Sequence, residues 1–151
     1  GVPVYKRPSG GETVVLSPRT LVISILIPEK NFRAPRIYFK EINDKIIKAL
    51  HETGIKNLRT DGISDICIGD KKILGSSIYR SKDRVFYHAV LNVSESTDTI
   101  EKYLKHPPRE PEYRNGRSHK DFVTSLNAQG YDLDFQKPQQ SLNKSLSIQN
   151  S

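Results

Sequence analysis

Residues 64–93 read SDICIGDKKILGSSIYRSKDRVFYHAVLNV, and this stretch decides the fold. Its apolar segments predict β-strands over residues 63–68, 72–80 and 85–93. Gly69-Asp70 is a tight-turn pair between the first two strands, and Ser81-Lys82-Asp83 joins the second to the third. Strands joined in order by such short turns make an antiparallel β-meander.

The rest of the chain supplies further strands and helices. Residues 35–52 carry apolar side chains at three- and four-residue spacing, with Pro35 near the start and Gly54 past the end, which is typical of an amphipathic helix. Shorter helices are predicted over residues 96–106 and 118–126, and strands over residues 2–5, 13–16, 21–27 and 55–58. The sum is an α+β fold, a mixed, mostly antiparallel sheet of about five to seven strands flanked by helices.

Length and composition predict one soluble domain. We expect residues 1–134 to form it, and residues 135–151 to be a mobile polar tail. The longest apolar run, residues 21–27, is far too short to cross a bilayer, so no membrane partner is expected. A single cysteine and no recognisable secretory signal point to the cytoplasm, or to the mitochondrial matrix in a eukaryote.

The formal net charge of +7 predicts an anionic partner. A nucleic acid, a phosphorylated ligand and an acidic protein all fit this charge. The basic residues are spread along the chain without a dense block, which disfavours nucleic acid.

Two segments carry residues suited to binding an anion. In Arg7-Pro8-Ser9-Gly10-Gly11, the glycines let backbone amides approach a ligand, and the arginine offers paired hydrogen bonds to a carboxylate or phosphate. Lys72 begins a strand that continues as Gly75-Ser76-Ser77, small residues that suit a ligand lying against the strand. Taken alone, each segment is better explained as a solvated turn. Only their combination indicates one anion-binding pocket.

Other reactive side chains favour structural roles. His88 shares a strand face with Phe86 and Val90, where a hydrogen-bonded core histidine is more common than a catalytic one. Cys67 shares a face with Asp65, whose charge would raise the pKa of the thiol, so a cysteine-based acyltransferase is disfavoured. We find no spacing typical of a metal site, a Walker loop or a Rossmann fingerprint.

Four motifs, in order over residues 1–126, resemble the lipoate–protein ligase family, whose catalytic domain is related to that of biotin protein ligases. KRPSGGETV at residues 6–14 is similar to the family pattern Arg-Arg-x-Ser-Gly-Gly-Gly-Thr-Val. SDI at residues 64–66 with DKKILGSS at residues 70–77 is similar to Asn-Asp-(apolar) followed by Gly-x-Lys-(apolar)-x-Gly-Ser-Ala. HAVL at residues 88–91 is similar to a His-Gly-(Thr/Ser)-Leu-Leu strand, and Arg117-Ser118 to an Arg-Ser pair before a short helix.

The resemblance implies a fold, a reaction and partners. The fold is that of class II aminoacyl-tRNA synthetases and biotin ligases, here lacking its N-terminal part. The reaction transfers a lipoyl or octanoyl group to a lysine, through lipoyl-adenylate or a similar acyl-adenylate made from lipoate and ATP with Mg²⁺. The acceptors are lipoyl domains of 2-oxoacid dehydrogenase complexes or the glycine-cleavage H protein, and an accessory subunit is a further implied partner.

The resemblance also implies residue roles. Lys72 is the catalytic residue that contacts the acyl carboxyl and the α-phosphate, and no metal ligand is implied. The implied substrate- or nucleotide-binding residues are Arg7, Ser9, Gly10, Gly11, Glu12, Thr13, Val14, Val15, Asp65, Gly75, Ser76 and His88.

The chain departs from the family pattern at four positions. Glu12, Arg19 and Ala89 replace glycines, and Ser64 replaces an asparagine. These departures keep a second interpretation open, in which a catalytically degenerate member binds lipoate, a nucleotide or a lipoyl domain without turnover.

Overall fold

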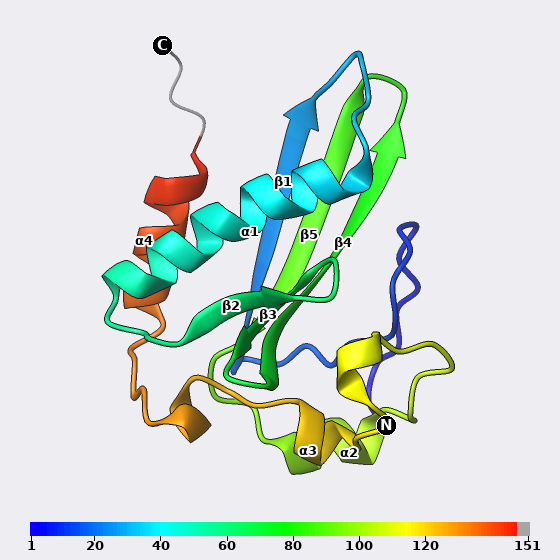
Figure 1. Cartoon of the computed structure of the whole chain (residues 1–151). Helices are drawn as coiled ribbons and strands as arrows, with labels where there is room; N and C mark the ends of the chain where they lie inside the picture. Colours follow the sequence, from blue (N-terminus) through cyan, green and yellow to red (C-terminus); the bar gives the residue numbers. More distant parts are fainter. Residues whose placement is uncertain (148–151) are drawn as a thin grey trace.

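The computed structural model describes residues 1–147, and five strands there form one antiparallel sheet in the order β1-β5-β4-β3-β2 (Figure 1). The strands are β1 (Thr20–Pro28), β2 (Leu58–Asp61), β3 (Asp65–Ile68), β4 (Lys71–Ser81) and β5 (Arg84–Asn92). The helical elements are α1 (Pro35–Glu52), α2 (Thr97–Tyr103), η1 (Glu112–Arg114), α3 (His119–Phe122), η2 (Asn127–Gln129) and α4 (Gln136–Leu146). The predicted α+β class is confirmed.

The predicted meander is also confirmed, because β3, β4 and β5 are successive antiparallel neighbours. Each lies within two residues of its predicted bounds. Across β4 and β5, Gly75 stands opposite Val90 and Ser77 opposite His88. This register places the small residues of β4 beside the histidine strand.

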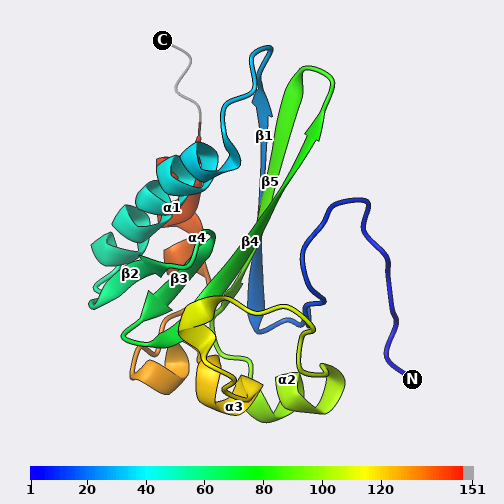
Figure 2. The same ribbon diagram turned by 45° about the vertical axis from the view of Figure 1, so that its right-hand side comes forward.

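Three strand predictions need correction. Residues 2–5 and 13–16 join no sheet in the described chain and run on the face of the sheet opposite α1 (Figure 2). Their β-branched residues favour extended backbone, but a strand also needs a partner edge. The strand predicted at residues 55–58 begins later, as β2 (Leu58–Asp61). Ile55 lies before it and packs fully buried in the core.

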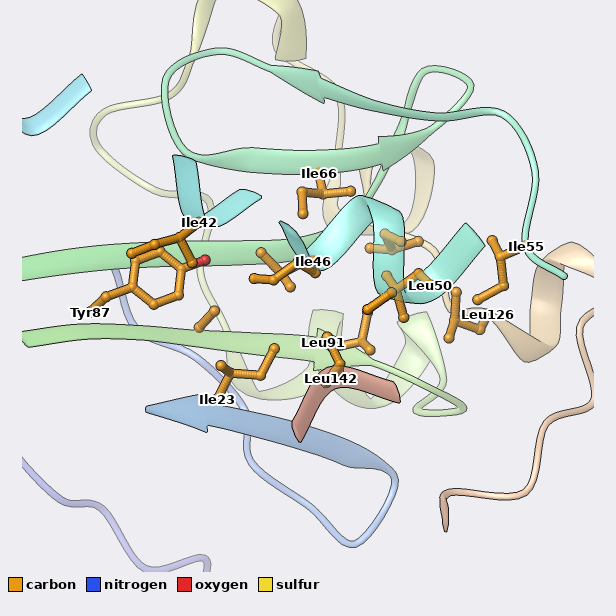
Figure 3. Close-up of a cluster of buried hydrophobic side chains, with 14 of the residues drawn as sticks. Ile23, Ile42, Ile46, Leu50, Ile55, Ile66, Tyr87, Leu91, Leu126 and Leu142 are labelled. Atoms are coloured by element: carbon orange, nitrogen blue, oxygen red, sulfur yellow. The ribbon is translucent and has the colours of Figure 1, made fainter. Parts of the chain in front are cut away.

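The hydrophobic core lies between α1, α4 and one face of the sheet. Tyr38, Ile42, Ile46 and Leu50 recur at helical spacing on α1 and are buried. Figure 3 shows Leu50 close to Leu91 of β5 and Leu142 of α4. This packing holds the sheet rigid from one side, and leaves its other face to the N-terminal segment.

Helix α4 overturns the prediction of an unpacked tail. It lies against α1, and Leu142 is only 3% exposed. The Ser141 and Ser145 hydroxyls donate hydrogen bonds to the Ala49 and Lys45 carbonyls at 2.8 and 3.0 Å. The polar composition hid this helix because its apolar stripe is narrow, formed by Pro138, Leu142 and Leu146, and the hydroxyl-to-backbone bonds add to it. Residues 148–151 of the predicted tail lie outside the described residues.

The two short helices end earlier than predicted. Ser96 caps α2 and Ser118 caps α3, each accepting a hydrogen bond from a backbone amide in the first turn. Helix α3 stops at Phe122 because the next residues turn back to β4, where the Thr124 amide donates to the Lys72 carbonyl at 2.9 Å. Over residues 1–147, no helix combines the length and apolar character needed to span a membrane.

Candidate active site

The amine of Lys72 is held in place by a carboxylate. Its Nζ lies 3.0 Å from Oδ1 of Asp65, and the side chains are 29% and 8% exposed respectively. The Tyr113 hydroxyl donates to the other oxygen of Asp65 at 2.8 Å. A largely buried carboxylate with two partners keeps its geometry, so the lysine at the start of β4 is positioned before any ligand arrives.

Gly75 provides the space for this ion pair. A Cβ built on Gly75 would lie 2.9 Å from both Cε and Nζ of Lys72. The lysine side chain therefore lies along its own strand and occupies the space that Gly75, three residues later, leaves open. The sequence interpretation gave this space to a ligand, whereas the structure fills it with the lysine.

For the acyl transfer that the sequence resemblance implies, we predict that Gly75→Ala lowers the rate by about 10–100-fold, because the new methyl group pushes the Lys72 amine away from Asp65. The clashing atoms are the flexible end of a side chain, so the melting temperature should stay near that of the wild type. Steady-state transfer rates and thermal melts measure both effects.

A double variant provides the control for Gly75→Ala. In a Lys72→Ala background the alanine has no amine to displace, so it should cause no further loss. Full additivity of the two substitutions would show that Gly75 acts through something other than Lys72.

The glycine turn packs onto β4 and β5, so the structure brings together the two predicted segments. Ser9 Oγ lies 2.7 Å from Nε2 of His88, and the Ser77 hydroxyl donates to the Gly10 carbonyl at 2.9 Å. Gly11 has a φ of +96°, a conformation that favours glycine. Burial, and secondarily the charge of Arg7, lower the pKa of His88, which keeps its imidazole neutral near pH 7.

Arg7 turns inward. Its guanidinium donates to the carbonyls of Gly10 and Glu12, at 3.2 and 2.6 Å, within its own turn. The sequence predicted that this guanidinium binds an external anion. Two of its three nitrogens, Nε and Nη2, instead hold the turn in shape.

A cavity of about 490 Å³ lies beside the turn, at the end of the sheet where α2 and α3 pack. Its size is typical of a small-molecule site, and its lining is mostly apolar. The predicted residues that line it are Glu12, Thr13, Val14, Val15, Lys72 and Gly75.

The other predicted residues lie around the cavity without lining it. Asp65 acts on Lys72, while Arg7, Ser9, Gly10, Gly11 and His88 form the turn-to-sheet cluster. Ser76 stands opposite the buried Ala89, on the core face, and its hydroxyl donates to the Ser64 carbonyl at 2.7 Å. The structure therefore gives Ser76 a bond within the sheet.

Sequence reasoning missed the outer wall of the cavity. This wall is the segment 103–123, which includes Leu104, Pro107, Arg114 and Phe122. Three cations surround the buried Phe122 ring, with Lys72 Nζ at 5.9 Å and the Cζ atoms of Arg114 and Arg117 at 4.7 and 5.3 Å from its centroid. The polar loop had no periodicity, so nothing in the sequence indicated that it folds back onto β4.

Cys67 is fully buried, and its thiol donates to the Tyr113 hydroxyl at 3.5 Å. Burial, with a smaller contribution from the charge of Asp65, raises the pKa of the thiol. A buried thiol with a raised pKa carries little thiolate at neutral pH, which argues against a cysteine nucleophile.

The family comparison agrees with this architecture. Residues 1–147 match the model of the lipoyl protein ligase A/B catalytic domain. The chain belongs to this family. The predicted lipoate–protein ligase relationship is confirmed, and the match extends past the domain end predicted at residue 134.

Curated relatives of this lipoyl ligase family member are longer proteins. The lipoate-protein ligase LplJ of Bacillus subtilis is 29% identical over 105 residues, which cover 70% of this chain and 31% of that protein. The chain thus spans about a third of the length of the curated relatives it matches.

Solved structures show the same ligase fold. A bipartite lipoate protein ligase from Thermoplasma acidophilum superposes with a TM-score of 0.77 at 21% identity, covering 92% of this chain and 54% of that one. Lipoate-protein ligase A bound with ATP gives a TM-score of 0.66 at 18% identity, with coverages of 83% and 50%. A biotin protein ligase from Aquifex aeolicus gives 0.62 at 20% identity, with coverages of 85% and 51%, in line with the predicted biotin ligase-like fold.

Proposed function

We propose that the chain transfers a lipoyl or octanoyl group from an acyl-adenylate to a lysine of a lipoyl domain. The observation that carries this proposal is the Lys72 amine, fixed by Asp65 on the wall of a cavity sized for a small molecule. The proposal draws further support from membership of the lipoyl ligase family.

Lys72 would act by stabilising charge. When the neutral acceptor amine attacks the acyl carbonyl carbon, negative charge grows on the carbonyl oxygen. The bond from that carbon to the phosphate oxygen then breaks, AMP leaves, and the amide nitrogen releases its extra proton to solvent. A preorganised cation in a partly buried site stabilises this charge without having to reorient. Asp65 and Tyr113 contribute by holding the cation, and the apolar lining suits an acyl chain or a base.

ATP and Mg²⁺ fit the activation step of this proposal. A neighbouring structure of the same fold is lipoate-protein ligase A bound with ATP. Within residues 1–147, no group of three or more His, Cys, Asp or Glu side chains could hold a metal ion. Mg²⁺ is therefore expected to enter with the nucleotide phosphates, as it does at most ATP sites.

A lipoyl domain fits as the acceptor. The Thermoplasma acidophilum structure comprises a bipartite ligase and its E2 lipoyl domain. The net charge of +7 favours an acidic partner and would speed the encounter. The H protein of glycine cleavage is a second acceptor of the same kind, and a bipartite relative makes an accessory subunit a reasonable partner.

Intact mass spectrometry of a lipoyl domain tests the proposal. We expect the chain, supplied with lipoyl-adenylate, to add one lipoyl group to the domain faster than the uncatalysed background. Lipoate with ATP replaces the adenylate in a second reaction that asks whether activation also resides in this chain. A rate equal to background with lipoyl-adenylate would instead support a binder without turnover, the role favoured by the Glu12 carboxylate on the cavity wall.

A further inference from the structure

Arg114 is a nearly buried cation on the outer wall of the cavity. Its side chain is 5% exposed. Nε donates to the Arg117 carbonyl at 2.9 Å, and Nη2 lies 3.4 Å from Nδ1 of His119. The His119 ring in turn bonds the Lys105 carbonyl through Nε2 at 3.0 Å, which assigns its proton to Nε2 and leaves Nδ1 to accept from Arg114. Two of the three guanidinium nitrogens are thus fixed by the loop.

The third nitrogen of the guanidinium, Nη1, is not held by the loop. Nη1 of Arg114 has no hydrogen-bond partner among residues 1–147, yet no fully buried side-chain nitrogen or oxygen in this part of the chain lacks a partner. Nη1 must therefore reach open space, and Arg114 lines the cavity. The remaining donor of an otherwise fixed guanidinium is therefore available to a ligand in the cavity that Arg114 lines.

The charge of Arg114 is incompletely compensated. Its nearest carboxylate oxygen is Oε2 of Glu110, 3.5 Å from Nε, on a side chain that is 28% exposed. Burial lowers the pKa of Arg114, which means that its surroundings disfavour the charged form. An anion in the cavity would supply the missing compensation, as a charge-assisted hydrogen bond.

Arg114 and Lys72 approach the cavity from different elements. Lys72 lies at the start of β4 and Arg114 in η1, and both stack over the Phe122 ring. Arg117 stacks over the same ring, but its three nitrogens already donate to the Arg114 carbonyl, Asp70 and the Tyr113 carbonyl. Arg117 also does not line the cavity, so it is a matched comparison for Arg114.

We propose that Arg114, which lines the cavity where Arg7 does not, binds the phosphate ester of the nucleotide. Arg114 is thus a phosphate-binding residue of the site, near the same Phe122 ring as Lys72. The inference rests on the proposed function, which places an adenylate in this cavity. It assigns the arginine of the phosphate site to the outer loop and not to the glycine turn.

Paired titrations of AMP and adenosine test the inference, because the two ligands differ only in the phosphate. Isothermal titration calorimetry would be run on the full chain as wild type, Arg114→Gln and Arg117→Gln. We expect the wild type and Arg117→Gln to bind AMP at least about tenfold more tightly than adenosine, and Arg114→Gln to bind both ligands about equally. Adenosine affinity should be the same in all three proteins if the variants keep their fold.

Two results would overturn the inference. One is a wild type that binds AMP no more tightly than adenosine. The other is a preference for AMP that both arginine variants keep or both lose. If Arg114→Gln does not fold, the ¹H–¹⁵N spectrum of the arginine side chains in the wild type decides: the Arg114 signals should shift with AMP and not with adenosine. Failure of the proposed function gives a different result. The preference for AMP would then still depend on Arg114, but the chain would transfer no lipoyl group to a lipoyl domain.

Discussion

Replacing Lys72 by alanine is expected to reduce lipoyl transfer from supplied lipoyl-adenylate by about 10²–10³-fold, the effect of removing one preorganised charge-stabilising group. The amine lies 3.0 Å from Asp65 on the cavity wall. No other charged residue of β4 lines the cavity, so none can replace it. Initial rates measured by intact mass of the lipoyl domain give the ratio directly.

Lys71→Ala is the matched control for Lys72→Ala. Lys71 is the preceding residue of β4, does not line the cavity, and should leave the rate within about twofold. Thermal melts check that both variants fold, since Asp65 keeps the Tyr113 hydroxyl as a partner when Lys72 is removed. Equal rates for the two variants would remove Lys72 from the mechanism.

Leu50→Ala should destabilise the fold by about 2–5 kcal/mol, as a buried leucine does when its loss leaves a cavity. Leu50 is completely buried where α1 meets β5 and α4, beside Leu91 and Leu142 (Figure 3). Rigid elements on three sides limit how far the site can collapse around the alanine.

Urea unfolding followed by circular dichroism measures this loss of stability. Ile37→Ala on the same helix is the control, because Ile37 is 40% exposed and should change the free energy of unfolding by less than about 1 kcal/mol. A loss at Leu50 no larger than the loss at Ile37 would mean that α1 is not anchored through this contact.

Periodicity explains which parts of the fold could be predicted. Strand β5 and helix α1 bury one face each, and such burial imposes a two- or three-to-four-residue repeat that is visible in the sequence. Residues 2–5 have strand composition but no partner edge, and a single sequence does not show where edges lie. Helix α4 packs through only a narrow apolar stripe, Pro138, Leu142 and Leu146, beside the Ser141 and Ser145 hydroxyls that bond α1, so its repeat is weak in a polar sequence.

Some residues of the candidate site could also be predicted from the sequence, and others could not. Lys72, Gly75 and the glycine turn stand out because small residues and a lysine are unusual in a strand. Arg114 does not stand out, since an arginine in a polar loop is ordinary until the loop folds back onto β4. Its role depends on burial and on which of its nitrogens are already bonded, and neither property can be obtained from spacing.

The two walls of the cavity also differ in how freely they can change over evolution. Lys72 and Asp65 belong to the paired strands β4 and β3 and lie beside a register shift between Ile66 and Cys67, so a further insertion would displace the pairs beyond it. The outer wall is a connection between β5 and α4 that meets the sheet at few points, such as Tyr113 on Asp65 and Thr124 on Lys72. Lengthening or exchanging this connection would reshape the bound acyl group or nucleotide while leaving the reactive lysine untouched, which gives the fold a route to new substrates.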